Sequence, residues 1–208
     1  MYSKYIKRIF DISVSILAII MCIPFFTIIS LFVRIKLGRP ILFKQLRVSK
    51  NNHIFTMYKF RTMRDSRDAN GNLLPNELRQ TKFGSFLRST SLDELPELWN
   101  ILKGDISFVG PRPLVPEYLP YYTEYELQRH KVRGGLIPPE VLYGDITPTW
   151  QQQFKYEIDY ANHVSFLLDF KIMIASLKGI FKRNAIQYGN YNRESFFQER
   201  RDKIKKED

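Results

Sequence analysis

Two adjacent carboxylates, Asp93 and Glu94, lie in the stretch RSTSLDELPELWN (88–100). Neighbouring carboxylates offer the oxygen ligands that Mg²⁺ prefers, so this pair could hold the cation. Four basic residues could bind the phosphates of a substrate: Lys59, Arg61, Arg88 and Arg112. Arg112 stands between two prolines, whose fixed φ would restrict the loop that carries its guanidinium. If these side chains converge, the sequence predicts a site that binds Mg²⁺ and a phosphorylated substrate.

The same carboxylates also have a purely structural explanation. Ser91 with Glu94 fits a capping box, and Asp93 alone could serve as a helix N-cap. A helix over 93–103 is predicted because apolar residues recur there at i, i+3, i+4 and i+7: Leu95, Leu98, Trp99 and Leu102. Pro96 is tolerated only in the first turn of such a helix. Helix capping and a functional site therefore both remain open at this point.

The charge balance of the chain points to an anionic partner. Its 208 residues contain 32 Lys and Arg against 21 Asp and Glu, which gives a net charge of +11. The candidate partners are nucleic acid, an acidic membrane surface and phosphorylated substrates. We expect no nucleic-acid partner, because no recognised binding motif is present. A membrane-tethered nucleic-acid binder is the alternative that composition alone would allow.

The residue inventory excludes several other classes of protein. Cys22 is the only cysteine, which excludes a disulfide framework and a multi-cysteine zinc site. The three histidines are widely spaced, which argues against a histidine-built metal centre. The sequence also lacks a P-loop, a GxGxxG stretch and an order of residues typical of a catalytic triad. Nothing therefore supports a hydrolase or a nucleotide-driven motor.

The N-terminal region predicts a membrane segment. Residues 12–33 contain no charged side chain, and at about 1.5 Å per residue they could cover a hydrocarbon core of about 30 Å. Pro24 lies near the middle, where it would bend the helix. Basic residues flank both ends, whereas a spanning helix normally has its Lys/Arg excess on one side. We therefore expect a re-entrant helix; a spanning helix and a buried core helix are the alternatives.

Short strands and helices are expected after this segment. Alternating apolar residues predict a hairpin of two strands, 41–47 and 54–60, around the turn SKNNH. The polar residues 64–80 are expected to form a loop. Two helices are predicted further on, a short one over 82–88 and a longer one over 121–133.

Residues 163–183 predict an amphipathic helix. Lysines cluster on one side, and the other side carries a set of apolar residues: Phe166, Phe170, Met173, Leu177, Ile180 and Phe181. A helix of this kind could lie on a membrane that contains anionic lipids, or it could pack on the core of the domain. The pattern fits both arrangements.

Together these patterns predict an α+β, predominantly helical fold. It combines an N-terminal re-entrant membrane helix, a small β-hairpin and interfacial amphipathic helices. We expect the basic-flanked membrane helix over 1–38 and a cytoplasmic catalytic domain, lying on the membrane interface, over 39–190. Residues 191–208 form a charged tail that is expected to be frayed.

Several motifs occur in one order along the chain: KRIFD, YKFRTM, SLDELPELWN, LKGDISFVGPRP and SFLLDFKI. In this combination the sequence resembles the monotopic phosphoglycosyl transferases, which are bacterial sugar transferases. The resemblance extends to about residue 183, and the length matches the minimal, single-domain members. The loop RDANGNLLPNELR also resembles that of the enzymes that act on UDP-N,N′-diacetylbacillosamine.

This resemblance implies transfer of a sugar 1-phosphate from a UDP-sugar to undecaprenyl phosphate, the first membrane step of glycoconjugate or polysaccharide assembly. Asp93 would be the nucleophile that attacks the β-phosphate, releases UMP and forms a phosphosugar–aspartyl intermediate. Glu94 would hold Mg²⁺, and the charges of Lys59, Arg88 and Arg112 would stabilise the phosphates. The resemblance also implies the cytoplasmic face of the bacterial inner membrane, anionic lipids as partners, and a homodimer as a further expectation.

The sequence departs from the family pattern in two places. Ile23 stands before Pro24, where relatives have a serine, so Thr27 or Cys22 would have to bond the backbone groups that the proline frees. Residues 133–146 read RGGLIPPEVLYGDI, where relatives show a pattern like RPGITGWAQVNGRN. This loses a cation and gains an anion. Either an active enzyme has altered recognition, or a catalytically weak member acts as a membrane-bound assembly partner.

Overall fold

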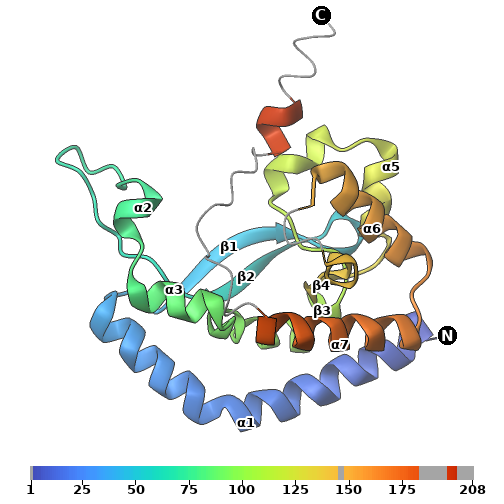
Figure 1. Cartoon of the computed structure of the whole chain (residues 1–208), viewed down its shortest axis with the longest axis horizontal. Helices are drawn as coiled ribbons and strands as arrows, with labels where there is room; N and C mark the ends of the chain where they lie inside the picture. The colour runs from blue at the N-terminus through green and yellow to red at the C-terminus, as the bar shows by residue number, and fades with distance from the viewer. Residues whose placement is uncertain (1, 145–147, 183–195, 201–208) are drawn as a thin grey trace, which may run out of the picture.

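The computed structural model describes residues 2–144, 148–182 and 196–200. Helices predominate in this part of the chain, and two separate two-stranded sheets complete the predicted α+β fold. A short π-helical segment, Tyr2–Ile6, leads into the long helix α1, Lys7–Lys36. Figure 1 shows α1 along the bottom edge of the molecule, with both sheets and all the other helices above it.

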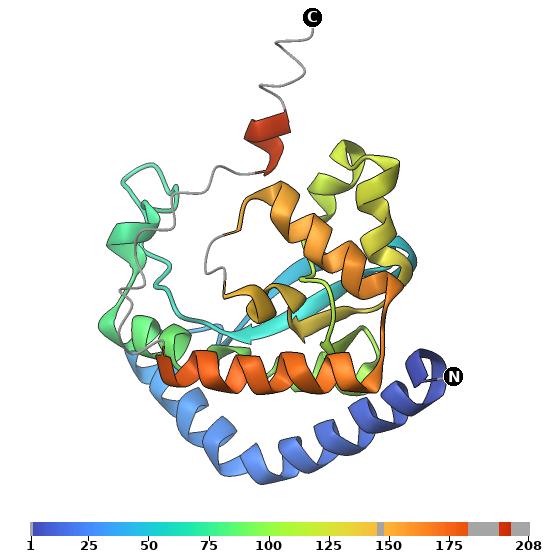
Figure 2. The same cartoon turned by 45° about the vertical axis from the view of Figure 1, so that its right-hand side comes forward.

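Helix α1 continues through Pro24 but is bent, so that both of its ends point toward the rest of the chain (Figures 1 and 2). Proline bends a helix because it has no backbone N–H to donate and its ring clashes with the preceding turn. The Thr27 hydroxyl donates to the Ile23 carbonyl at 3.1 Å. Relatives have a serine before this proline, and Thr27 or Cys22 was expected to replace its hydrogen bond. Thr27 makes such a bond to the backbone beside Pro24.

Most apolar side chains of α1 face away from the rest of the molecule. Ile9, Met21 and Ile35 are 64%, 66% and 70% exposed, whereas Ile29 and Val33 pack on the interior. Among the described residues, this is the one helix whose length and composition would let it cross a membrane. The alternative of a buried core helix is therefore wrong. So large an exposed apolar surface requires lipid or a partner to cover it.

The predicted hairpin is confirmed. Strands β1, Leu42–Val48, and β2, Ile54–Phe60, pair in antiparallel orientation. The connecting turn contains a short 3₁₀ segment, Lys50–Asn52. Asn51 and Asn52 have φ of 54° and 60°, a left-handed conformation that asparagine adopts more easily than most residues.

The segment after the hairpin is irregular up to α2, Asn76–Arg79, so the predicted loop is right except for its last turn. Helix α3, Lys82–Ser89, confirms the short helix predicted there. Its apolar residues divide between core and surface: Leu87 is buried, and Phe86 is 54% exposed.

The helix predicted over 93–103 starts later than expected. Helix α4 spans Glu97–Lys103, with Pro96 as its N-cap residue. Proline suits the start of a helix because its missing N–H would have no intrahelical partner there. Gly104 has φ of 94° and ends the helix in the left-handed conformation that glycine adopts without strain.

The capping explanation of the two carboxylates is wrong. Asp93 lies in a separate 3₁₀ turn, Leu92–Glu94, before the helix, so it is not the N-cap of α4. Ser91 has φ of 54° and makes no side-chain cap of the 3₁₀ turn, so there is no capping box with Glu94. The reason is Pro96, which delays the start of α4 and leaves Asp93 one turn ahead of it.

A parallel pair of strands, β3, Ile106–Val109, and β4, Gly134–Ile137, forms the second sheet, which the sequence did not predict. The backbones next to this pair approach closely. A Cβ on Gly135 would lie 2.0 Å from the Gly110 nitrogen, and one on Gly110 would lie 2.4 Å from the Arg133 carbonyl oxygen. Only glycine fits at these two positions.

We expect Gly135→Ala to lower the free energy of unfolding by about 2–3 kcal/mol, because the added methyl forces the β3 and β4 backbones apart. Gly179→Ala in α7 is the matched control, since a Cβ there would meet no atom within 4 Å. Thermal unfolding of both variants in detergent checks this. Equal midpoints for the two variants would contradict the close approach at Gly135.

The single helix predicted over 121–133 is wrong. The region consists of three short pieces: 3₁₀ Pro116–Tyr121, α5 Glu124–Leu127 and 3₁₀ Gln128–Lys131. Thr123 has an extended backbone and forms a capping box with Glu126, so a new helix starts there and cannot continue the turn before it.

A 3₁₀ segment, Pro139–Tyr143, and helix α6, Trp150–Asn162, follow β4. The tail was expected to be frayed, but residues 196–200 are helical. Phe196 is fully buried against the aromatic rings of Trp150 and Phe154. Burial of an aromatic ring stabilises this part of the tail, which charge composition alone does not reveal. The rest of the tail lies outside the described residues.

Helix α7, Phe166–Lys182, confirms the amphipathic helix and runs alongside α1 in both views (Figures 1 and 2). It packs on the domain through Ile172, which is fully buried. Three residues of the predicted apolar face are exposed instead: Phe166, Phe170 and Leu177. This outward orientation is typical of a helix at a membrane interface. The side chains of Ile180 and Phe181 lie outside the described part of the chain.

Candidate active site

Three carboxylates and one lysine gather at the start of α4. The Nζ atom of Lys59 lies 2.7 Å from Glu94 Oε1 and 3.1 Å from Glu97 Oε1. Asp93 is 8% exposed and Glu97 only 2% exposed, so both carboxyl groups are largely removed from water. Charges interact more strongly in such surroundings than in bulk water. The lysine therefore compensates part of the negative charge that the three acids bring together.

The β2 strand and α4 hold this group in place. Side chains alternate along a strand, which places Lys59 on the same face of β2 as Met57, and Met57 packs against α4 residues in the core. Asn100 of α4 is fully buried and joins the two elements. Its Nδ2 donates to the Thr56 carbonyl at 2.7 Å, and its Oδ1 accepts from the Tyr58 N–H at 3.2 Å. Glu97 lies one turn before Asn100 and so next to Lys59.

Burial and the neighbouring Glu94 raise the pKa of Asp93 to about 6, although Lys59 and Arg88 act in the opposite direction. Burial also raises the pKa of Glu97 to about 7, against the attraction of Lys59. Burial would lower the pKa of Lys59, but Glu94 and Glu97 outweigh it and raise that pKa. Because its pKa lies below 7, Asp93 is mainly ionised at neutral pH. It can therefore act as a nucleophile without a separate base.

Two more of the predicted phosphate-binding cations influence the pKa values of this group. Arg88, in the last turn of α3, donates from Nε to the Thr62 hydroxyl at 2.9 Å, and its charge lowers the pKa of Asp93. Arg112 is exposed, and its charge lowers the pKa of Glu97. Lys59, Arg88 and Arg112 therefore come from three different parts of the chain to one cluster of carboxylates.

The structure does not bring Arg61 into this cluster. Arg61 is 6% exposed, and its Nη1 donates to the Arg39 carbonyl at 2.6 Å and to Asp65 Oδ2 at 3.0 Å. Its guanidinium thus holds the connection between α1 and β1. Strand β2 ends at Phe60, so the alternation that directs Lys59 toward α4 does not extend to Arg61.

The backbone of Arg112 is fixed by a buried ion pair. Glu157 Oε1 accepts from the Arg112 N–H at 2.9 Å, and Arg129 donates to the Arg112 carbonyl. Arg129 Nε and Glu157 Oε2 are 2.6 Å apart, and both side chains are almost fully buried. A buried pair of this kind is stable only when further hydrogen bonds satisfy it, and the Arg112 peptide supplies two of them. The pair therefore positions the loop that carries Arg112.

Two charged residues near the site escaped the sequence prediction. Glu97 lies within the helix predicted over 93–103, and its spacing of i+3 from Glu94 could have placed both on one face. Burial lowers the pKa of Arg47 on β1, and the charge of Arg112 lowers it further. Only the pairing of β1 with β2 brings Arg47 to this region.

The divergent segment 133–146 contributes a further buried acid, Glu140. Burial and the charge of Glu157 raise the pKa of Glu140 to about 7, and Arg112 acts against this shift. The segment thus places a buried carboxyl group on the side of Arg112. Asp145, the anion noted in the sequence, lies outside the described residues.

The donor set fits Mg²⁺ bound together with a substrate. Asp93 and Glu94 offer only oxygen ligands, and Mg²⁺ commonly takes one or two carboxylates and completes its shell with water and phosphate oxygens. Within the described residues, no three His, Cys, Asp or Glu side chains are arranged to hold a metal by themselves.

Comparison with known proteins connects this site to one family. The sequence model of the family described as bacterial sugar transferase matches residues 2–183. The chain is 44% identical over 190 residues to the sugar transferase EpsL of Bacillus subtilis (strain 168), covering 89% of this chain and 92% of that protein.

Two longer proteins are also similar. The chain is 33% identical to the UDP-glucose:undecaprenyl-phosphate glucose-1-phosphate transferase of Klebsiella pneumoniae, covering 86% of this chain and 41% of that protein. It is 34% identical to the undecaprenyl-phosphate galactose phosphotransferase of Salmonella typhimurium, covering 79% of this chain and 36% of that protein. The chain thus spans less than half the length of these two proteins.

Proposed function

Because the chain belongs to the bacterial sugar transferase family and is a phosphoglycosyl transferase, we propose that it transfers a sugar 1-phosphate from a UDP-sugar to undecaprenyl phosphate. The observation that supports this most directly is the buried Asp93 carboxylate with Lys59 and Arg88 beside it. A nucleophile of this kind attacks phosphorus well when cations offset the negative charge of the substrate.

The proposed reaction has two steps at one phosphorus atom. In the first, an Asp93 oxygen bonds to the β-phosphorus of the UDP-sugar, and the bond from that phosphorus to the bridging oxygen breaks. UMP leaves with the electron pair of the broken bond, and the sugar phosphate remains on Asp93. In the second, an oxygen of undecaprenyl phosphate bonds to the same phosphorus, and Asp93 leaves as a carboxylate.

The cations of the site stabilise the charge that these steps move. Arg88 and Lys59 lie next to Asp93 and would face the phosphate that reacts, and Arg112 would bind the part of the diphosphate that departs as UMP. Mg²⁺ held by Glu94 would neutralise diphosphate charge and so make UMP a better leaving group.

We further propose that the chain lies on the cytoplasmic face of the bacterial inner membrane. The bent, apolar α1 would dip into one leaflet, and the exposed apolar face of α7 would rest on the headgroups. Undecaprenyl phosphate keeps its phosphate at this depth, where the second step needs it. The basic residues at both ends of α1 favour the cytoplasmic side.

Release of UMP tests the proposal. Purified full-length protein with Mg²⁺, undecaprenyl phosphate and a panel of UDP-sugars should liberate UMP with at least one sugar. The panel includes UDP-N,N′-diacetylbacillosamine, which the loop resemblance favours. Intact mass after incubation without undecaprenyl phosphate should show one added sugar phosphate on the chain.

The second candidate function is that of a weakly active, membrane-bound assembly partner. The loss of a cation in 133–146 and the buried Glu140 favour this candidate. If a folded preparation releases no UMP with any sugar and shows no added mass, the transferase proposal fails and the assembly role is favoured.

Labelling from one side of the membrane tests the re-entrant arrangement. In a Cys22→Ser background, cysteines at Ser3 and Lys36 are both expected to react with an impermeant maleimide added from the cytoplasmic side of inverted vesicles. Both positions are exposed, one near each end of α1. A cysteine at Met21, near the bend, should stay unlabelled. Reaction of the two end positions from opposite sides would show a spanning helix instead.

A further inference from the structure

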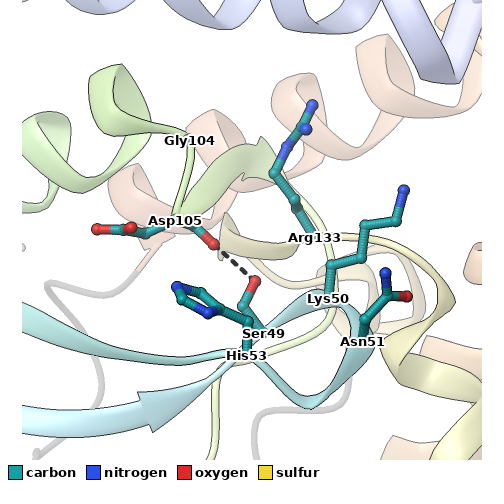
Figure 3. Close-up of a pocket in the computed structure, with 7 residues that line it drawn as sticks. All are labelled: Ser49, Lys50, Asn51, His53, Gly104, Asp105 and Arg133. Atoms are coloured by element: carbon teal, nitrogen blue, oxygen red, sulfur yellow. Dashed lines mark hydrogen bonds between the residues drawn. The ribbon is translucent and has the colours of Figure 1, made fainter.

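A pocket of about 210 Å³ lies at the other end of α4 from Asp93. It is lined by Ser49, Lys50, Asn51, His53, Gly104, Asp105 and Arg133. The hairpin turn forms one wall, and the end of α4 forms another (Figure 3). At about 30 Å³ for each water, this volume equals that of roughly seven waters, which is enough for a phosphodiester group. The reaction proposed above does not use this pocket.

Cations dominate the charge around this pocket. Lys50 and Arg133 both line the pocket, and their side chains extend in the same direction (Figure 3). Arg8 lies beside the end of α4. Its guanidinium would be 3.1 Å from a Cβ on Gly104, and it donates to the Ile101 and Leu102 carbonyls at 2.7 Å each. Burial lowers the pKa of Arg133; the charge of Asp11 acts against this shift, and the charge of Arg8 adds to it. Two guanidinium groups that repel each other are stabilised by an anion between or beside them.

The acids near the pocket offset only part of this charge. Asp105 is engaged by Lys103 at 3.0 Å and by the Asn100 amide at 2.9 Å. Asp11 Oδ1 accepts hydrogen bonds from the Ser107 hydroxyl at 2.9 Å and the Phe108 N–H at 3.2 Å, and its Oδ2 forms an ion pair with Arg133 at 3.8 Å. The Nε atom of Arg133 is buried without a hydrogen-bond partner among the described residues.

The pocket lies at the depth where the apolar surface of α1 begins. Arg8 and Asp11, which adjoin it, are in the first turns of α1, and Ile9 between them is 64% exposed. From Ile12 onward the helix carries no charge up to Arg34. A helix that enters a bilayer places this boundary at the headgroups, where lipid phosphates lie.

We propose that this pocket binds the phosphate of an anionic phospholipid headgroup, with Lys50 and Arg133 as its direct contacts and Arg8 as a neighbouring positive charge. The proposal rests on the membrane-bound function proposed above. It gives the chain a lipid site separate from the reaction site, one that fixes the N-terminal end of α1 at the interface.

Native mass spectrometry of the full chain in detergent tests the proposal, with phosphatidylglycerol, phosphatidylcholine and inorganic phosphate as three separate probes. We expect one phosphatidylglycerol to bind at least about tenfold more tightly than phosphatidylcholine. Lys50→Glu and Arg133→Gln should each weaken that binding about tenfold. Lys131→Glu, an exposed lysine of the same region outside the pocket, should change it less than about twofold.

Two outcomes overturn the inference. Equal losses in Lys50→Glu and Lys131→Glu would show attraction by net charge without a site, and inorganic phosphate binding as tightly as phosphatidylglycerol would show a soluble ligand. Release of UMP is measured on the same preparations and should be unchanged in Lys50→Glu. Wild-type protein that releases UMP but retains no lipid disproves the pocket alone, and retained lipid without UMP disproves the transferase reaction alone.

Discussion

Asp93→Asn is expected to lower UMP release by at least about a thousandfold and to abolish the added mass of the sugar phosphate. The amide has nearly the shape of the carboxylate but cannot form the covalent bond to phosphorus, and loss of a covalent nucleophile has effects of this size. Asp159→Asn, an exposed carboxylate of α6, controls for the change of net charge and should leave the rate unchanged. Substantial residual release with Asp93→Asn would remove the covalent mechanism.

The stability of the same variant separates a catalytic role from a structural one. Burial raises the pKa of Asp93 to about 6 in the folded chain, against about 3.9 in an unfolded one. The protonated carboxyl thus favours folding below pH 3.9, and this contribution is lost as pH rises through 6. At pH 8 Asp93→Asn should therefore be more stable than the wild type, by at most about 3 kcal/mol, with the difference vanishing near pH 4. Thermal unfolding at the two pH values checks this.

Lys59→Met is expected to lower UMP release about a hundredfold at pH 7 and to move its pH profile to higher pH. Lys59 is the cation within 3.1 Å of both Glu94 and Glu97, and removal of one partner leaves buried negative charge uncompensated. Without Lys59 the pKa of Asp93 rises further, so a smaller fraction is ionised at neutral pH.

Rates of UMP release between pH 5.5 and 9 measure this shift. In the wild type the rate should rise with pH through about 6, because Asp93 reacts as the carboxylate. Lys44→Met is the matched control, since Lys44 is an exposed lysine on the partner strand β1, and its profile should match the wild type. A slower Lys59→Met enzyme with an unmoved profile would mean that Lys59 binds substrate without tuning Asp93.

Local patterns predicted the elements that local forces decide. Alternation gave the hairpin, and 3.6-residue periodicity gave α7, because the side-chain directions of a strand and of a helix repeat with fixed periods. The same periodicity placed the start of α4 too early, since it does not register that Pro96 shifts the first hydrogen-bonded turn. It also merged three short pieces into one helix over 121–133.

Orientation was harder to predict than periodicity. The apolar stripe of α7 fits a core helix and an interfacial helix equally well, and only its packing through Ile172 left Phe166 and Phe170 outside. The burial of Phe196 in the C-terminal tail was equally hard to predict from the sequence. Phe196 packs among aromatic rings that come from distant parts of the sequence, so its burial is a property of the assembled fold.

The sequence by itself determined the family, the apolar helix with Pro24, and the pair Asp93 and Glu94, because these depend on residue type and short-range order. Only the tertiary structure decided which charges act together. It joined Lys59 to Glu94 and Glu97, directed Arg61 to the α1–β1 connection, and raised the pKa of Asp93 by burial. The physical reason is that electrostatic energy depends on distance and desolvation, and folding sets both for residues far apart in the chain.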